Sequence, residues 1–565
     1  MAATAPTRRD EALASIRGAG RARVLIIGGG INGIATFRDL ALQGIDVVLV
    51  ERGDFASGAS SASSHMVHGG IRYLENGEFR LVHESVQERN DLLKTAPHFV
   101  KPLKTTIPIY STFAGLVSAP LKFLGLGSGT PSERGAALIK AGLVMYDLFA
   151  RSGRSTPRHA FHGRARSLAE LPAMNPDLKY TATYFDASMH DPERLALDVL
   201  NDGVAAGGRA VNHVEAIGRE GNEVVLRDNA TGEEFRIAAE AVVNASGPWT
   251  DLTNSALGDA TAYMGGTKGS HIVLDNPELV EATGGREIFF EHSDGRIVLI
   301  YPLKGKAMVG TTDIPADPRE PAVCTEDEVD YFFDLIRNVF PSIAVSREQI
   351  VYRFAGIRPL PASDADRPGQ VSRDYRIVEG ELDGLPVISL VGGKWTTFRA
   401  LGETLSDRVL YLLKAPRVAG TRGRAIGGGR DYPETPAEAS AWQRTHLGDD
   451  SARTRLLFER YGTRAADVAA FLAEGDDEEL LGGELSRREV AWMVREEQAV
   501  RLSDVILRRT SIAFTGRADA DALGVVADAM APERGWTPAE RDAEVDATAA
   551  LLRDAHGVEP ERELA

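Results

Sequence analysis

The chain is organised around a glycine-rich turn that joins an apolar strand to an amphipathic helix. Residues 23–27 (RVLII) are apolar and rich in β-branched side chains, which is typical of a buried strand, and they run directly into three glycines. Residues 32–43 then place apolar side chains at helical spacing, Gly44 ends the helix, and 45–50 (IDVVLV) follow as a second buried strand. A strand, a helix and a strand in this order predict a βαβ unit and a parallel sheet.

The turn fits the fingerprint of a dinucleotide-binding site. Gly28, Gly30 and Gly33 occupy the three glycine positions of G-x-G-x-x-G, after a strand and at the start of a helix. The first glycine permits the tight turn, the second lets the backbone approach a pyrophosphate, and the third allows close packing of helix on strand. The helix N-terminus offers N–H groups to the phosphates. Glu51, after the second strand, is placed to accept hydrogen bonds from ribose hydroxyls and disfavours the 2′-phosphate of NADP.

The fingerprint alone does not distinguish FAD from NAD. Two later segments, 242–249 (VVNASGPW) and 390–398 (LVGGKWTTF), each run from an apolar strand into small residues. A NAD site is often compact and N-terminal, whereas a flavin ring has to be reached from several strand ends. The wide spacing of these three elements therefore favours FAD.

Composition and charge exclude several classes of protein. The 565 residues carry a formal net charge of −17, which argues against nucleic acid as a partner because phosphate backbones are bound by clustered positive charge. A negatively charged substrate would need a local positive pocket in this acidic chain. The single cysteine, Cys324, excludes an internal disulfide and cysteine-based metal sites, and no HExxH or EF-hand spacing occurs. No metal is predicted.

No segment predicts secretion or a membrane span. Residues 1–20 contain no apolar run of signal-peptide length and are interpreted as an N-terminal arm, and no run of about 18 apolar residues occurs. The nearest candidate, 113–127 (FAGLVSAPLKFLGLG), is interrupted by Pro120 and Lys122. We interpret it as a partly buried loop and helix, with contact to a membrane surface as the alternative. A cytoplasmic protein is expected, with peripheral attachment to the cytoplasmic membrane face left open.

The pattern of the sequence changes along the chain. Alternating strands are predicted in 210–244 and 267–310, whereas 102–186 has an irregular pattern, and helical periodicity dominates after a glycine-rich linker near residue 420. These patterns predict an α/β protein: a Rossmann-type FAD-binding domain, an antiparallel-sheet substrate domain (α+β) and a C-terminal all-helical domain. The expected boundaries are 1–20 for the arm, 21–420 for the FAD-binding domain (about 21–101, 187–262 and 355–420) with the substrate domain inserted (about 102–186 and 263–354), and 430–565 for the helical domain.

Several motifs together resemble those of the FAD-dependent glycerol-3-phosphate dehydrogenases, within the D-amino-acid-oxidase-like flavoproteins. In chain order they are GGGINGIA (28–35), SSASSHMVHGGIRYLE (60–75), EFRLVHESVQERNDLL (78–93), YFDASMHDPERL (184–195), VNASGPW (243–249), KGSHIVL (268–274), VGTTD (309–313), GIRPL (356–360), SRDY (372–375) and GGKWTTFR (392–399). The helical block 489–510 is similar to the family's C-terminal domain. The resemblance covers about residues 21–515.

This resemblance implies oxidation of sn-glycerol 3-phosphate at C2 to dihydroxyacetone phosphate. A hydride would pass to flavin N5, and the electrons would then pass to a membrane quinone. Two alternatives stay open: an oxidase that uses the same pocket and passes electrons to oxygen with formation of peroxide, and a flavin-binding redox sensor without catalysis. The oligomeric state is not readable from the sequence, with a homodimer as one alternative.

The implied substrate is a dianion, so cationic side chains are the first candidates for the site. Arg358 in GIRPL and Arg373 in SRDY are predicted to bind the phosphate, because guanidinium groups form paired hydrogen bonds with phosphate oxygens. Arg72 and Tyr73 are assigned to the substrate's hydroxyl groups or phosphate. The resemblance places Lys394 beside the flavin pyrimidine edge, where a cation would stabilise the anionic reduced flavin.

Oxidation at C2 also needs a base for the hydroxyl proton. Histidine is the usual base near neutral pH, with His271 as the first candidate and His68 as the second. The predicted catalytic groups are therefore His271, Arg358 and Lys394. Residues predicted to hold the triose or orient the base are Thr311, Thr312 and Asp313. The further predicted cofactor contacts, which also include His68, are Asn32, Ser60, Ser61, Ser64, Gly69, Gly70, Ala245, Gly247, Gly392, Gly393 and Thr396.

One pair of charged residues is predicted to be structural and not catalytic. Asp191 and Arg194, in HDPERL, stand at the expected start of a helix and are interpreted as an ion pair with each other.

Overall fold

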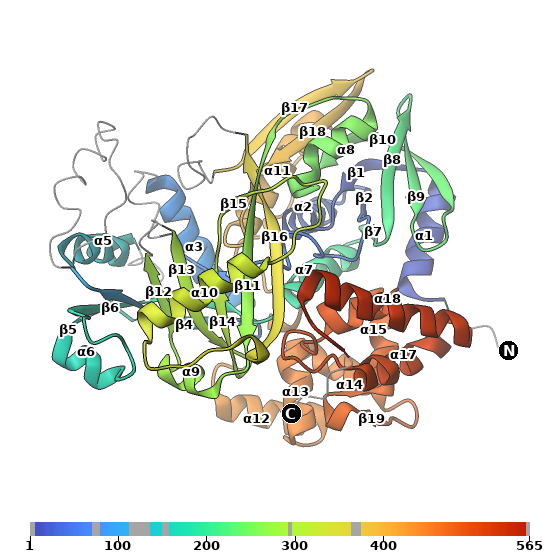
Figure 1. Cartoon of the computed structure of the whole chain (residues 1–565). Helices are drawn as coiled ribbons and strands as arrows, with labels where there is room; N and C mark the ends of the chain where they lie inside the picture. Colours follow the sequence, from blue (N-terminus) through green and yellow to red (C-terminus); the bar gives the residue numbers. More distant parts are fainter. Residues whose placement is uncertain are drawn as a thin grey trace.

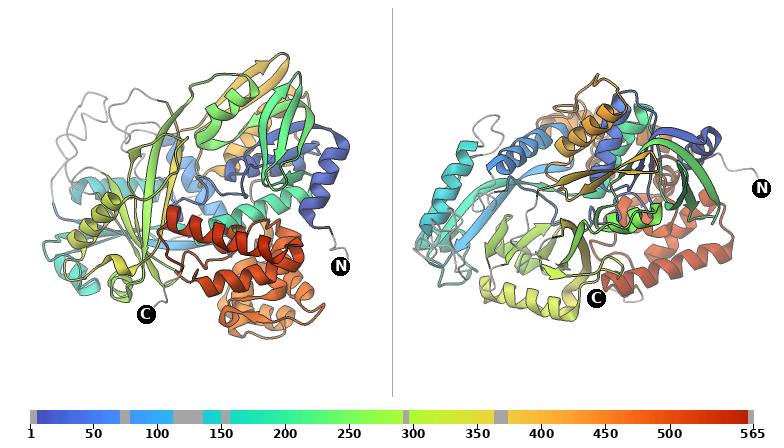
Figure 2. Two further views of the ribbon diagram at one scale, coloured as in Figure 1. Left: turned by 45° about the vertical axis from the view of Figure 1, so that its right-hand side comes forward. Right: turned by 90° about the horizontal axis from the view of Figure 1, so that it is seen from above.

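Two large β-sheets form the centre of the protein in a computed structural model. The structure describes residues 6–70, 79–111, 136–149, 157–291, 296–362 and 374–560. Sheet A has the order β17-β18-β10-β1-β2-β7, with β9 paired to β10 and β8 to β9. Sheet B has the order β15-β11-β14-β13-β12-β4-β6-β3, with β16 paired to β11 and β5 to β6. Figures 1 and 2 show the two sheets beside one another and a helical C-terminal module, orange to red, packed against them.

The parallel core of sheet A contains the βαβ unit expected from the glycine turn, formed by β1, α2 and β2. Its parallel strands are β1 (Arg21–Ile27), β2 (Val47–Val50), β7 (Arg209–Val211), β10 (Glu234–Asn244) and β18 (Leu385–Val391). Antiparallel strands extend the sheet: β8 (Val214–Glu220), β9 (Glu223–Asp228) and β17 (Arg376–Leu382). β2 is buried along its whole length, as expected for a strand covered on both faces.

Helices cover sheet A and bury its apolar side chains. They are α1 (Arg8–Ala19), α2 (Ile31–Leu42), α7 (Pro192–Ala205), α8 (Thr250–Leu257) and α11 (Phe398–Leu412). α2 packs between α7 and α11, and the three helices share one hydrophobic core with β1 and β2. The predicted N-terminal arm contains α1, which begins at a capping box formed by Thr7 and Asp10.

Sheet B is mostly antiparallel. Its strands are β3 (Met66–Val67), β4 (Val100–Ile109), β5 (Ala160–Gly163), β6 (Tyr180–Met189), β11 (Met264–Leu274), β12 (Glu287–Glu291), β13 (Ile297–Leu303), β14 (Lys306–Gly310), β15 (Ile314–Pro315) and β16 (Ile350–Pro361). Its helices are α3 (Phe79–Thr95), α5 (Ala136–Phe149), α6 (Arg164–Glu170), α9 (Pro277–Ala282) and α10 (Glu326–Val339). The long pair of β11 and β16 positions the candidate site described below.

The irregular pattern predicted for 102–186 is wrong at both ends of that segment. β4 and β6 pair antiparallel from Val100 opposite Met189 to Ile109 opposite Tyr180. Two prolines and two lysines lie within β4, so its sequence does not alternate cleanly between apolar and polar residues. Its partner β6 also lies about 80 residues further along the chain, so no local sequence pattern indicates the pairing.

The C-terminal module is helical, as predicted, and contains one short hairpin. Its helices are α12 (Pro436–Leu447), α13 (Ala452–Tyr461), α14 (Ala465–Leu472), α15 (Arg487–Glu497), α16 (Leu502–Asp504), α17 (Ala520–Arg534) and α18 (Pro538–His556). The hairpin joins β19 (Glu479–Leu480) to β20 (Leu485–Ser486). A π-helical turn, η8 (Val505–Arg509), follows α16 directly. The core of the module is continuous with side chains of β13, β14 and β16.

The predicted ion pair of Asp191 with Arg194 is wrong. Arg194 donates to Glu497 of the C-terminal module, with distances of 2.6 Å from Nη1 to Oε2 and 2.9 Å from Nη2 to Oε1. Asp191 instead pairs with Lys304, with 2.8 Å between Nζ and Oδ1. The two side chains at the start of α7 therefore bind different neighbours, both remote in sequence.

Within the described ranges, no helix combines the length and the apolar character that crossing a bilayer requires. The apolar segment 113–127, on which the sequence left two interpretations open, lies outside the described residues.

Candidate active site

The glycine turn after β1 is packed too tightly for side chains. A Cβ on Gly33 would lie 2.1 Å from the carbonyl oxygen of Gly28, and a Cβ on Gly28 would lie 2.6 Å from that of Ala245. β1, the start of α2 and the end of β10 therefore meet backbone to backbone, as the fingerprint predicts. Ser60 Oγ accepts a hydrogen bond of 3.0 Å from the N–H of Ile31 at the start of α2.

Glu51 lies beside this turn. Its two carboxylate oxygens accept hydrogen bonds from the N–H groups of Gly29 (2.6 Å) and Gly53 (2.9 Å). Burial raises the pKa of Glu51 above the ordinary value, and these two backbone hydrogen bonds act in the opposite direction. The contacts hold the carboxyl group at the end of β2, next to the N-terminus of α2.

Three segments far apart in the sequence meet at the start of α2. A Cβ on Gly393 would lie 2.2 Å from Nδ2 of Asn32, so the turn 392–396 lies directly against the first residues of the helix. Trp395 Nε1 donates to the carbonyl oxygen of Ser60 (2.9 Å), and Thr396 Oγ1 donates to that of His68 (3.3 Å). The structure thus brings together most of the predicted cofactor-contacting segments.

Two adjoining cavities lie along these segments. The larger has a volume of about 650 Å³ and the smaller about 300 Å³, and the residues that line both are Ala59, Ala62, Gly356 and Ile357. The larger one reaches Arg52, whose guanidinium lies 4.3 Å from the ring centroid of Trp249. Predicted site residues that line the smaller one are Ser64, His68, Gly70, His271, Thr311, Arg358, Lys394 and Thr396.

Arg358 of β16 is held in a fixed orientation at the wall of the smaller cavity. Nη1 donates to Asp313 (2.8 Å), and Nη2 donates to Thr311 Oγ1 (3.1 Å) and to the carbonyl oxygen of Thr312 (2.9 Å). A Cβ on Gly269 of β11 would lie 2.2 Å from Nη2, so glycine at that position makes room for the guanidinium. The VGTTD segment therefore positions the arginine.

Thr312 does not line either cavity. Its hydroxyl accepts a hydrogen bond from the Ser270 N–H (3.0 Å) and donates to Glu328 (2.6 Å), behind the wall of the site. Its predicted contact with the triose is not favoured by this geometry, which makes Thr312 part of the scaffold beneath Arg358. Thr311 does line the cavity.

His271 is buried at the centre of β11, with its ring stacked on Phe354 at a centroid distance of 4.7 Å. Nε2 lies 2.8 Å from Ser64 Oγ, and Nδ1 is buried without a hydrogen-bond partner among the described residues. Burial holds the pKa of His271 well below its ordinary value, and the positive charge of Arg358 lowers it further. The imidazole is therefore neutral at neutral pH and can accept a proton.

Three predicted substrate contacts, Arg72, Tyr73 and Arg373, lie outside the described residues. Of the remaining predicted cofactor contacts, Ser61 donates its hydroxyl to the carbonyl oxygen of Gly58 (3.0 Å), and Gly247 and Gly392 adopt the left-handed backbone conformation.

Comparison with known proteins assigns the family. Residues 23–408 match the family described as FAD dependent oxidoreductase, and residues 419–541 match the C-terminal domain of alpha-glycerophosphate oxidase. The chain belongs to the FAD-dependent oxidoreductases. A glycerol-3-phosphate dehydrogenase of Synechocystis is 34% identical to this oxidoreductase, and the match covers 92% of the present chain and 94% of the relative. A D-erythritol 1-phosphate dehydrogenase of Brucella abortus is 33% identical, over 86% and 93%.

A solved structure has the same fold. The glycerol-3-phosphate dehydrogenase from Bacillus halodurans, complexed with FAD, superposes with a TM-score of 0.75 at 24% identity, covering 99% of this oxidoreductase and 100% of that chain. This likeness supports the fold assignment: an FAD-binding α/β architecture with a helical C-terminal module.

The residues present in this oxidoreductase fit FAD. Gly28 and Gly33 have the backbone-to-backbone packing that the fingerprint requires, and Glu51 lies at the ribose position of the fingerprint. Asn32 Oδ1, at the start of α2, is buried and finds no hydrogen-bond donor within the described part of the chain. An unpaired buried acceptor is costly, so a donor from a bound ligand at this position would satisfy it.

Sequence reasoning missed a buried aspartate that contacts Gly69, one of the predicted cofactor-binding residues. Asp186 of β6 lines the smaller cavity, and its Oδ1 accepts from Gly69 N (2.8 Å), Arg89 Nη1 (2.9 Å) and Tyr146 OH (2.5 Å). Burial, together with Asp186, raises the pKa of Tyr146 well above its ordinary value, so the phenol remains a donor. The only signal in the sequence was a single charged residue within an otherwise uncharged strand.

Proposed function

We propose that this oxidoreductase oxidises glycerol 3-phosphate at C2 to dihydroxyacetone phosphate. The observation that carries the proposal is that a guanidinium, an imidazole and an ammonium group, those of Arg358, His271 and Lys394, line one cavity of about 300 Å³ in a chain with a net charge of −17. Relatives from Synechocystis and Pseudomonas tolaasii that bear the name glycerol-3-phosphate dehydrogenase support it.

Arg358 binds the phosphate in this proposal. Its guanidinium is oriented by Asp313 and Thr311 before substrate arrives, so little conformational freedom is lost on binding. Charge-assisted hydrogen bonds to phosphate contribute about 1.5–3 kcal/mol each. Asp313, whose Oδ1 accepts a hydrogen bond of 2.8 Å from Arg358 Nη1, balances part of the arginine's charge.

His271 acts as the base. Because it is neutral at neutral pH, it can take the proton of the C2 hydroxyl as the C2–H bond breaks. Bound FAD supplies the acceptor for the hydride. Lys394 places a cation in the same cavity, where it favours the negative charge that develops during the reaction.

The substrate proposal has one named competitor. The Brucella abortus relative is called a D-erythritol 1-phosphate dehydrogenase, so a phosphorylated four-carbon polyol is the second candidate. Both substrates carry a phosphate, for which the same arginine would serve. They differ in chain length, so the choice between them depends on the depth of the cavity beyond the base.

The experiment is anaerobic reduction of the bound flavin by candidate substrates, monitored through the visible absorption of the flavin. We expect glycerol 3-phosphate to bleach the purified yellow protein, glycerol to leave it oxidised, and D-erythritol 1-phosphate to act more slowly. Faster bleaching by D-erythritol 1-phosphate would transfer the proposal to the second candidate. If glycerol bleached the flavin as fast as glycerol 3-phosphate, or if neither phosphate ester bleached it, the cavity would not have the proposed phosphate-binding role.

We infer a membrane quinone as the electron acceptor, reached by a protein attached peripherally to the membrane surface. Oxygen is the alternative acceptor. The named dehydrogenase relatives support the first, and the C-terminal match to an oxidase domain supports the second. Mixing reduced protein with a quinone or with oxygen separates them: fast reoxidation by quinone with little peroxide is expected, and stoichiometric peroxide at turnover rate would indicate an oxidase.

A further inference from the structure

The loop that follows Glu51 is held by hydrogen bonds and ion pairs from the C-terminal module. Asp54, in this loop, is fully buried, and its Oδ2 accepts from Arg508 Nε (2.6 Å) and Arg509 Nη1 (2.7 Å). Its Oδ1 accepts from Arg509 Nη2 (2.9 Å) and Asn212 Nδ2 (2.9 Å). Both arginines belong to η8, more than 450 residues further along the chain.

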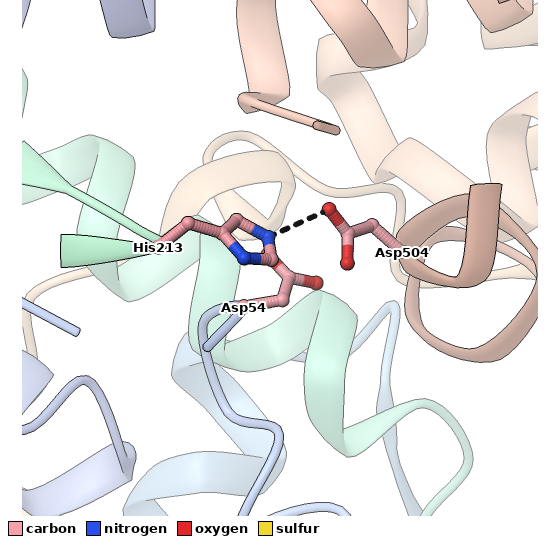
Figure 3. A group of neighbouring side chains, drawn as sticks. All are labelled: Asp54, His213 and Asp504. Atoms are coloured by element: carbon pink, nitrogen blue, oxygen red, sulfur yellow. Dashed lines mark hydrogen bonds and ion pairs between the residues drawn. The ribbon is translucent and has the colours of Figure 1, made fainter. Parts of the chain in front are cut away.

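A second acid completes the group. Asp504 Oδ2 lies 3.0 Å from His213 Nε2 and accepts from the N–H groups of Val500 and Arg501, both at 2.9 Å. Its Oδ1 accepts from Arg508 Nη2 at 2.7 Å. Figure 3 shows Asp54, His213 and Asp504 converging from three separate segments, with the contact between His213 and Asp504 dashed.

This group is an ion-pair network and does not have the form of a metal site. The ligand atoms of Asp54, His213 and Asp504 lie within 4.8 Å of one another, which a metal ion can exploit. Here, however, each of the four carboxylate oxygens already accepts an N–H hydrogen bond, and two guanidinium groups supply the positive charge. Burial alone would raise the pKa of Asp54, but Arg509 and Arg508 outweigh it, so the carboxylate stays charged.

The network is connected to the predicted ribose contact through short backbone links. Gly53, the residue before Asp54, donates its N–H to Glu51 (2.9 Å), and its carbonyl oxygen accepts from the N–H of His213 (2.7 Å). Glu51 in turn accepts the Val214 N–H at its own carbonyl oxygen (2.7 Å). Arg508 also lines the larger cavity, which continues into the smaller one. Any shift of Asp54 would therefore displace the loop that carries Glu51.

We propose that the C-terminal module is a clamp for FAD, in which Asp54, Arg508 and Arg509 act as positioning residues that hold the Glu51 loop in its ribose-binding geometry. The module then contributes to retention of the cofactor, although its residues follow the FAD-dependent oxidoreductase match in the sequence. Removing one partner of a buried ion pair leaves an uncompensated charge, and the loop has to move to solvate it.

The test is the affinity of apoprotein for FAD, measured by quenching of FAD fluorescence. Asp54→Asn keeps the shape of the side chain but removes its charge, and we expect the dissociation constant for FAD to rise by at least about tenfold. Activity should return when FAD is supplied in excess. The matched control is Glu489→Gln, which disrupts a buried network inside the C-terminal module, with Arg453, Arg460 and Tyr461. It should lower the melting temperature but leave FAD affinity within about twofold.

The clamp proposal would be wrong if Asp54→Asn bound FAD as tightly as wild type, or if Glu489→Gln lost as much FAD affinity as Asp54→Asn. If Asp54→Asn does not fold, Arg508→Gln tests the same contact from the other side. Wild-type protein provides a test without any substitution. Because coupling between two sites is reciprocal, FAD should slow amide hydrogen exchange in residues 498–509 of the apoprotein. Unchanged exchange there, with slowing around residues 28–33, would also contradict the proposal.

Discussion

Ser64 and His271 share a contact of 2.8 Å between Oγ and Nε2, although 207 residues separate them in the chain. Ser64 comes from the loop before β3, and His271 from the middle of β11. The contact fixes the plane of the imidazole between the serine and the ring of Phe354. It therefore places the proposed base at a defined point on the wall of the smaller cavity, and the two residues can be tested separately.

Replacing the base should slow the chemical step. We expect His271→Asn to lower the rate of flavin reduction by glycerol 3-phosphate about 10²–10⁴-fold, the usual contribution of a general base. Ser64→Ala keeps the imidazole but removes the hydroxyl that orients it, so we expect a smaller decrease in the reduction rate, of about tenfold. Stopped-flow measurement of flavin bleaching separates this step from substrate binding. A wild-type rate for His271→Asn would exclude His271 as the base and leave His68 as the candidate.

Removing the guanidinium should weaken substrate binding. Arg358→Ala should raise KM for glycerol 3-phosphate by roughly 10²-fold, as expected for the loss of charge-assisted hydrogen bonds worth about 3 kcal/mol. Arg358→Lys should recover only part of this, because an ammonium group lacks the planar fork. Arg353→Ala, on the same strand but lining neither cavity, is the matched control. Equal KM values for the two alanine variants would place the phosphate elsewhere.

The glycine turn predicts a steric effect on cofactor content. Gly33→Ala would place a methyl group 2.1 Å from the carbonyl oxygen of Gly28, so α2 has to move away from β1. We expect the variant to be purified without FAD, as measured by the ratio of visible to ultraviolet absorption. Gly18→Ala is the control, since a Cβ at that helical position meets no atom within 4 Å. Full FAD content in Gly33→Ala would show that the turn is not the phosphate site.

Glu287 should make stability depend on pH. This side chain is fully buried at the start of β12, and burial raises its pKa to about 8, with the hydrogen bond from Thr105 acting in the opposite direction. The folded state therefore holds a proton that the unfolded state releases above about pH 4.5, so the stability contributed by this group falls as pH rises from 4.5 to 8.

Glu287→Gln removes that dependence. The free energy of unfolding of the variant relative to wild type should increase by ~1.4 kcal/mol per pH unit between pH 5 and 7, the slope for one proton. Urea denaturation at several pH values measures the difference, in which contributions of unchanged groups cancel. Parallel curves for the two proteins would show that Glu287 is ionised in the folded state.

Local patterns were sufficient for the elements around the cofactor. The strand, the glycine turn and the helix at residues 21–42 follow from backbone requirements that are written into neighbouring residues, and the strand ends near 245 and 392 carry their own glycines. Local sequence does not indicate three other features: the pairing of β4 with β6, the ion pair of Arg194 with Glu497, and the burial of Thr312 behind Arg358. Each depends on a partner contributed by a distant segment.

The amino-acid order alone predicted a dinucleotide-binding site, because the fingerprint depends on steric limits within a few residues. It also singled out arginine, lysine and histidine as candidates for an anionic substrate. Only folding decided which of these groups share a cavity, that VGTTD orients an arginine, and that Asp54 joins the cofactor loop to the C-terminal module. Charges and hydrogen bonds act over a few ångströms in space, and sequence separation does not limit them.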